Sequence, residues 1–87
     1  MDRKTKYLWF REIENPGRKT RRVQVISLSQ RMPLADIHWY GAWRQYVFDP
    51  QPDTTWNNGC LLDVLSVLDE LRAEQRRKTP SAGRLAI

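Results

Sequence analysis

LADIHWYGAWRQYVFDPQPDTTWNNGCLLDVLSVLDEL, residues 34–71, contains two hydrophobic periodicities, and the change between them lies near residue 56. Before that point, aromatic and branched side chains alternate with polar ones, which is typical of β-strands over Leu34–Tyr40 and Trp43–Asp49. After it, leucine and valine recur at helical spacing. Asn57 or Asn58 supplies the side chain that caps such a helix. The stretch therefore predicts a β-hairpin followed by an amphipathic helix.

Two further strands are expected before this stretch. Lys6–Glu14 and Thr20–Leu28 are rich in aromatic and branched residues, and the turn sequence NPGR at 15–18 separates them. The apolar stripe of the helix consists of Leu61, Val64, Leu65, Leu68 and Leu71. We expect an α+β fold in which a four-stranded antiparallel meander (ββββ) is followed by one C-terminal amphipathic helix packed on one sheet face. Residues 1–78 form this single ββββα domain, and residues 79–87 form a flexible C-terminal tail.

The turn inside the second hairpin determines which side chains share a sheet face. A two-residue turn of Gly41 and Ala42 pairs Ile37 with Tyr46 and places Trp39 on the same face. A three-residue turn would give every residue of the last strand a different partner and move it to the opposite sheet face. The two-residue turn is favoured because it gives the more apolar face, and Trp39, Tyr46 and Phe48 are then expected in the core. Which face the helix covers stays open.

Charge is distributed unevenly along the chain. Residues 1–22 carry eight Lys or Arg against three acids, residues 23–71 carry two against six, and residues 72–87 carry five against one. Both ends are therefore basic and the middle is acidic. Such an asymmetry favours attraction to a polyanion, most often nucleic acid, although the same cations also keep a small protein soluble.

The sequence favours a protein that is not an enzyme. Cys60 and His38 are the only cysteine and histidine, so an internal disulfide and a cysteine zinc cage are excluded, and no partner at usable spacing suggests catalysis or a metal site. Cys60 is expected to act as a small apolar side chain. We expect no cofactor and no metal. The absence of a stretch of about 20 apolar residues argues against a membrane span, and a cytoplasmic location in a bacterial host cell is expected.

Two segments, IHWYGAWRQYVFDP at 37–50 and TWNNGCLLDVL at 55–65, resemble a recurring signature. The signature has the form I-x-W-Y-x-x-W-R-x-Y-x-F-x-P, then T-x-W or T-x-F, then C-L-x-D-I. It is similar to that of small uncharacterised proteins of bacteriophages, prophages and integrative elements. The resemblance covers about residues 34–71, and it implies no activity and no catalytic residues. The first hairpin and the basic tail lie outside it.

Two functional hypotheses follow. The first is a nucleic-acid-binding accessory factor that acts through a basic hairpin and the end of the helix, with contacts from Arg18, Lys19, Arg21, Arg22, Arg76, Arg77 and Lys78. The second is an inhibitor or adaptor that binds a host protein through exposed aromatic residues, namely Tyr7, Trp9, Tyr40 and Trp43. Binding to a polyanion should weaken steeply with salt, whereas hydrophobic docking should not.

Overall fold

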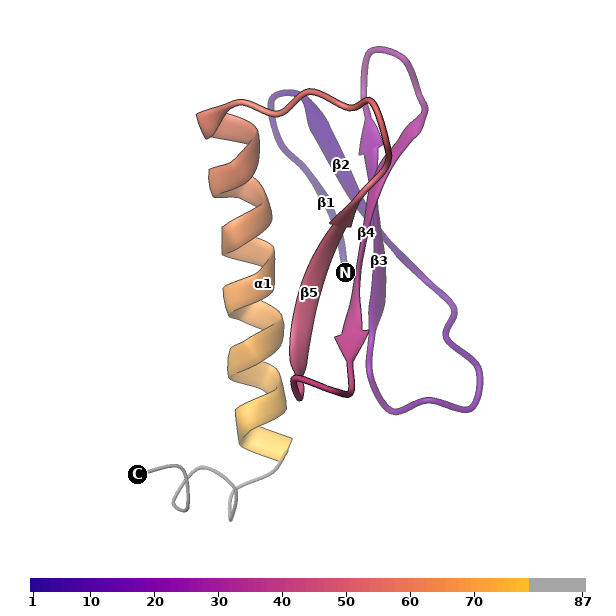
Figure 1. Ribbon diagram of the computed structural model, residues 1–87, viewed down its shortest axis with the longest axis vertical. Helices are drawn as coiled ribbons and strands as arrows, with labels where there is room; N and C mark the ends of the chain where they lie inside the picture. The colour runs from indigo at the N-terminus through magenta and orange to yellow at the C-terminus, as the bar shows by residue number, and fades with distance from the viewer. Residues whose placement is uncertain (79–87) are drawn as a thin grey trace.

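The computed structural model describes residues 1–78 of the 87-residue chain. Within these residues the chain forms a five-stranded antiparallel sheet and one helix (Figure 1). The elements are β1 (Asp2–Lys4), β2 (Leu8–Ile13), β3 (Arg22–Ser27), β4 (Pro33–Tyr40), β5 (Gln45–Pro50) and α1 (Asn58–Lys78). The fold is α+β, as the sequence predicts, and the strands lie in the sheet in chain order. The predicted tail, 79–87, lies outside the described residues.

The sheet has one strand more than the four predicted. β1 pairs with β2 at the edge of the sheet, where Asp2 lies opposite Arg11 and Lys4 lies opposite Trp9. The three residues of β1 are all charged, so no alternation of apolar and polar side chains marks them as a strand. Backbone pairing with β2 holds β1 in place, together with the ion pair of Arg3 with Glu70 of α1 and the contact of Lys4 with the Trp9 ring. The sequence pattern carries no signal for that kind of strand.

The hydrophobic core lies between the sheet and α1. The helix covers one face of the sheet (Figure 1), and the buried residues of the central strands alternate along each strand, so they point to that face. The buried members are Leu8, Phe10, Val23, Val25, Ala35 and Ile37 from the sheet, with Val64, Val67 and Leu71 from the helix. Burial of this apolar surface supplies the main driving force for folding. The intervening strand residues form the outer sheet face, on the side away from α1.

The loop between β4 and β5 has four residues, Gly41–Arg44, instead of the predicted two. Tyr40 pairs with Gln45 and Ile37 pairs with Phe48, so each partner on β5 is displaced by two residues from the predicted register. The loop closes through turn hydrogen bonds and a left-handed backbone at Arg44, with φ +52°, which the residue types do not signal. A shift of two residues preserves the sheet face. The predicted pairs are therefore wrong, whereas the predicted shared face is right.

Trp39 lies at the rim of the core rather than inside it. Tyr46 and Phe48 pack against the core as expected. Trp39 is half-buried and makes an edge-on contact with Tyr46, with ring centroids 5.3 Å apart. The prediction of Trp39 as a core residue is wrong because this residue is next to last in β4, at the end of the sheet.

The segment that joins β5 to α1 is anchored by Trp56 and Asn57. The Trp56 ring meets Phe48 edge-on at a centroid separation of 4.9 Å, and Trp56 Nε1 donates to Thr54 Oγ1 at 2.8 Å. Asn57 Oδ1 accepts the backbone N–H of Cys60 at 2.8 Å. This bond satisfies one of the free N–H groups at the start of the helix, so Asn57 is the cap that the sequence predicts.

The buried face of α1 consists of Val64, Val67 and Leu71, with Leu68 and Cys60 partly buried against the core. The predicted stripe differs, because Leu61 and Leu65 are 44% and 51% exposed. Apolar residues occupy more than one side of α1, so the sequence pattern alone does not fix the rotation of the helix. No helix within residues 1–78 is long and apolar enough to cross a membrane.

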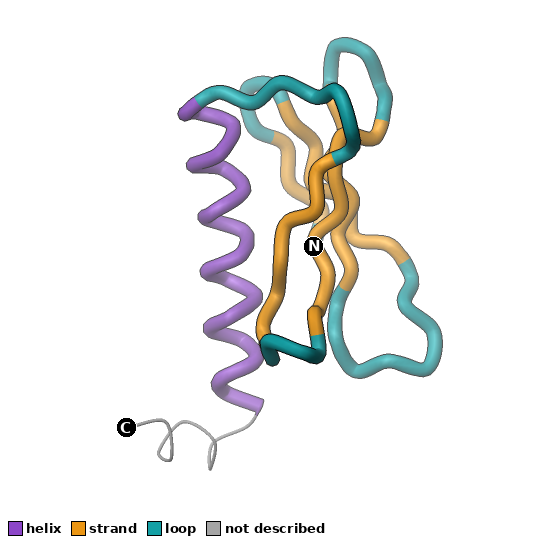
Figure 2. Tube along the Cα trace, viewed as in Figure 1, coloured by secondary structure: helices purple, strands orange, loops and turns teal. Residues whose placement is uncertain are grey.

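Antiparallel neighbours place the connections of this fold at two opposite ends (Figure 2). The β2–β3 loop, the β4–β5 loop and the C-terminal turn of α1 lie at one end. The β1–β2 and β3–β4 loops lie at the other, together with the segment that leads into α1. The order of the strands therefore determines which loops share an end of the molecule. It places residues near 18 at the same end as residues near 77.

Candidate nucleic-acid interface

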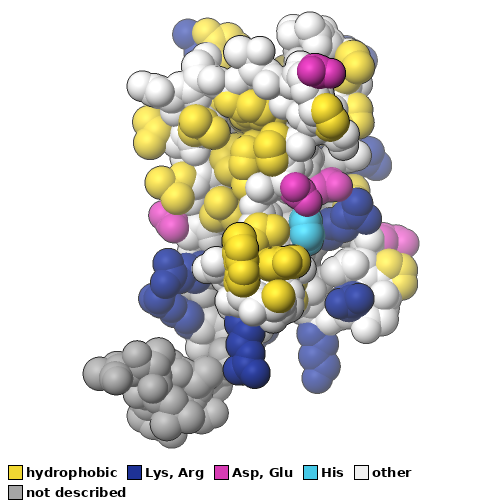
Figure 3. Space-filling model, in the orientation of Figure 1, with side chains coloured by type: hydrophobic (Ala, Val, Ile, Leu, Met, Phe, Trp, Pro, Cys, Tyr) yellow, Lys and Arg dark blue, Asp and Glu magenta, His cyan; other side chains and the backbone are white. Residues whose placement is uncertain are grey.

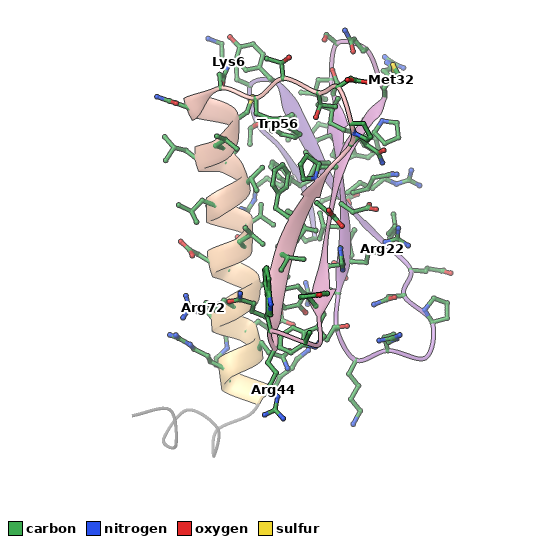
Figure 4. All side chains as sticks on the ribbon, in the orientation of Figure 1. Lys6, Arg22, Met32, Arg44, Trp56 and Arg72 are labelled. Carbon is green, nitrogen blue, oxygen red and sulfur yellow. The ribbon has the colours of Figure 1, made fainter. Side chains whose placement is uncertain are left out.

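The two predicted basic clusters lie at the same end of the molecule. One comes from the β2–β3 loop and the start of β3, and the other from the last turn of α1. Figure 3 shows Lys and Arg side chains at this end, and Figure 4 places Arg44 there as well. We call it the basic end, and its cations are Arg18, Lys19, Arg21, Arg22, Arg44, Arg76, Arg77 and Lys78. The fold therefore joins charges that are more than fifty residues apart in the sequence.

Arg21 connects the two clusters through Glu74 of α1. Its Nε lies 3.2 Å from Glu74 Oε1, and its guanidinium also approaches Glu12 Oε1 at 3.4 Å. Lys78 Nζ lies 3.0 Å from the same Glu74 oxygen. The hydrogen bond from Lys78 and the nearby positive charges lower the pKa of Glu74 below its ordinary value of 4.5, against the opposing effect of desolvation. Arg21 therefore fastens α1 to the sheet, whereas Lys78 pairs with Glu74 within the helix.

Arg22 also forms an ion pair, because its Nη2 lies 3.0 Å from Asp36 Oδ2 on the neighbouring strand. The remaining predicted cations, Arg18, Lys19, Arg76 and Arg77, are exposed, and within residues 1–78 none of them forms an ion pair. Three of the seven predicted cations are thus in ion pairs with acids, and the other four are not, although Arg77 lies near enough to Glu74 to help lower its pKa.

Arg44 belongs to the basic end although the sequence analysis does not assign it there. It is exposed, it lies in the β4–β5 loop, and no described acid pairs with it. Tyr40 immediately precedes this loop and Trp43 lies in it, and their rings make an edge-on contact with centroids 5.0 Å apart. Trp43 is 65% exposed and Tyr40 is 41% exposed. The signal for this grouping is the hairpin position of Arg44, which antiparallel topology places beside the β2–β3 loop.

The four aromatic residues predicted for protein binding do not form one surface. Tyr40 and Trp43 lie at the basic end. Tyr7 belongs to the β1–β2 loop at the opposite end, where Figure 4 labels Lys6, and Trp9 lies on the outer face of β2 beneath the side chains of Lys4 and Arg11. A single partner would have to span the length of the sheet to contact all four.

Other reactive side chains are dispersed. His38 Nε2 lies 3.3 Å from Asp49 Oδ2, and its Nδ1 lies near the backbone oxygen of Trp39. Cys60 is partly buried in the first turn of α1 and packs against the core. Across the described residues, 1–78, no three His, Cys, Asp or Glu side chains lie close enough to hold a metal ion.

The chain is similar to an uncharacterized 9.3 kDa protein of Acholeplasma phage L2. The two are 29% identical over 73 residues, which cover 84% of this chain and 94% of the phage protein. The similarity is therefore longer than residues 34–71 and extends over most of both chains. No family model matches the chain, and no solved structure matches it. The comparisons support a small protein of phage type.

Proposed function

We propose that this protein is a nucleic-acid-binding accessory factor of phage type that contacts phosphate groups through its basic end. The observation that carries the proposal is the convergence of two sequence-distant cation clusters on one end of the fold. Arg18, Lys19, Arg44, Arg76 and Arg77 are exposed there and pair with no acid of the described chain. Unpaired surface cations are available to replace the counterions of a nucleic acid.

The paired cations of the same end have a separate role. Arg21 and Lys78 hold Glu74, and Arg22 holds Asp36, so these three contribute to the surface potential but not to direct phosphate contacts. Of the seven residues predicted to contact phosphate, four are therefore kept, namely Arg18, Lys19, Arg76 and Arg77. Arg44 is added to them. Contacts of this type position a protein on the phosphate backbone and do not read the bases. Binding should therefore be tolerant of sequence.

The test is fluorescence anisotropy with a random labelled duplex, at several salt concentrations, for wild type and for Arg18→Gln, Arg77→Gln and the double variant. Each lost phosphate contact should reduce the slope of log affinity against log salt by about 0.9. Lys6→Gln is the matched control, since it removes one exposed charge at the opposite end of the molecule (Figure 4). It should leave the slope unchanged.

Equal slopes for wild type and the double variant would contradict the basic end as the contact surface. Loss of affinity in Lys6→Gln as large as that in Arg77→Gln would indicate attraction by net charge alone. If the duplex and a random single strand both fail to bind at low salt, the nucleic-acid proposal is wrong. Salt-insensitive binding of a host protein that Trp43→Ala weakens would then favour the protein-binding function.

A further inference from the structure

A groove on the outer sheet face combines an aromatic ring with three cations. It has a volume of about 430 Å³ and lies over β2 and β3, near the end opposite to the basic end. Lys4, Trp9, Arg11 and Arg31 line it, together with Gln24 and the strand ends that lead into the β3–β4 turn. The volume lies within the range of small-ligand sites, roughly 300–1,000 Å³. We call it the Trp9 groove.

Two of the three cations of the Trp9 groove lie over the ring, and neither forms an ion pair with a described acid. Lys4 Nζ lies 5.3 Å from the centroid of the Trp9 ring, and Arg11 Cζ lies 5.6 Å from it. No carboxylate lines the groove, and Asp2, the cross-strand neighbour of Arg11, forms no ion pair with it. A guanidinium or ammonium that rests on an aromatic face keeps N–H groups free for an anion.

Arg31 closes the groove from the β3–β4 turn. Its backbone has φ +57°, and its N–H donates to Ser27 O at 2.7 Å. The strained left-handed conformation is held by this turn, and the exposed side chain pairs with no acid among the described residues. The groove thus has an aromatic floor with Lys4 and Arg11 over it, and a third cation at the β3–β4 turn.

We propose that the Trp9 groove holds one nucleotide of a single-stranded nucleic acid, whose base replaces the Lys4 and Arg11 side chains over the Trp9 ring while these cations and Arg31 contact the adjacent phosphates. This inference rests on the proposed nucleic-acid function and adds that the nucleic acid is single-stranded. Base stacking on an aromatic side chain requires an unpaired base, so a duplex does not enter the groove. A single strand reaches it along the outer face of β3, where Gln24 lies between the basic end and the groove.

The experiment compares oligothymidylate of about ten nucleotides with a duplex of similar length, by anisotropy at low salt. Trp9→Leu should weaken oligothymidylate binding by at least about fivefold, since one stacking contact is lost, and should leave duplex binding within about twofold. Trp9→Phe keeps a ring and should restore most of the affinity. Thermal unfolding of each variant verifies that the fold persists.

Arg31→Asn provides a second variant that does not depend on Trp9 packing, because asparagine tolerates a positive φ. It should lower the salt slope for oligothymidylate by about 0.7 and leave the duplex slope unchanged. Lys6→Gln is the matched control, since Lys6 lies at the same end but does not line the groove. It should leave both slopes unchanged.

Three outcomes would contradict this inference, and they differ in what they mean for the proposed function. Unchanged oligothymidylate affinity in both Trp9→Leu and Arg31→Asn, with duplex binding still sensitive to Arg77→Gln, overturns the Trp9 groove and leaves the basic end intact. Failure of both nucleic acids to bind at low salt overturns the two proposals together. Binding of thymidine monophosphate that Trp9→Leu abolishes, without any binding of oligothymidylate, contradicts the single-strand assignment.

Discussion

Glu74 links positive charges of the sheet and of the last helical turn. Its lowered pKa means that the ionised form is favoured in the folded state, because Lys78 and Arg21 stabilise the carboxylate. The associated stability is present above the unfolded pKa near 4.5, and it is lost as the pH falls through the lower pKa of the folded state. The contact thus stabilises the docking of α1 at neutral pH but not in acid.

We predict that Glu74→Gln lowers the free energy of unfolding by about 0.5–1 kcal/mol at pH 7 and by less near pH 3, because the ionised fraction of Glu74 falls with pH. Urea unfolding at both pH values provides the measurement. Glu14→Gln is the matched control, since Glu14 is exposed and makes no ion pair with any residue of 1–78. A difference that persists unchanged at pH 3 would show that the ion pairs of Glu74 are not its source.

Ile37 and Trp39 occupy the same face of β4 but differ in burial. Ile37 is fully buried among the core residues, whereas Trp39 is half-buried at the rim. We predict that Ile37→Ala lowers the free energy of unfolding by about 2–5 kcal/mol, because it leaves a cavity. Trp39→Ala should lower it by about 1–2 kcal/mol, since a rim residue loses one aromatic contact and partial burial. Chemical denaturation of the two variants checks this order. A larger loss of unfolding free energy in Trp39→Ala than in Ile37→Ala would mean that Trp39 is a core residue after all.

At the scale of elements, the rotation of α1 is the feature that the pattern of leucines misplaces. Val67 is buried, whereas Leu65 is exposed. We predict that Val67→Ala lowers the free energy of unfolding by about 2–3 kcal/mol, because two buried methyl groups are removed. Leu65→Ala should change it by no more than about 0.5 kcal/mol. Comparable losses in thermal stability for both variants would contradict this prediction. They would mean that Leu65 packs against the sheet, as in the stripe predicted from the sequence.

The strands that bury side chains are the ones that the sequence predicts well. β2, β3, β4 and β5 each contain an alternation whose apolar members enter the core, and α1 has a cap and helical spacing. β1 and the four-residue loop Gly41–Arg44 depend on backbone hydrogen bonds, which side-chain patterns do not encode. The same limit applies to the candidate site: composition reveals the cations, but not which of them are paired with acids.

At the scale of the whole molecule, the Trp9 groove depends on β1, which the sequence pattern does not predict. Lys4 reaches the Trp9 ring because β1 pairs with β2 in that register. Arg31 reaches the groove from a turn on the other side of β3. Three separate segments therefore supply its charge. The basic end is likewise assembled from two loops and a helix terminus, so neither surface is visible as a continuous motif.

The strand order of the sheet has a consequence for how the chain acquires its structure. Every strand pairs with the next one along the chain, and α1 lies beside the strand that immediately precedes it. Contacts between residues close in sequence require little loop-closure entropy. Low contact order is associated with fast folding of small domains. During synthesis, successive hairpins can therefore form as they leave the ribosome, while closure of the core waits for Val64, Val67 and Leu71 near the end of the chain.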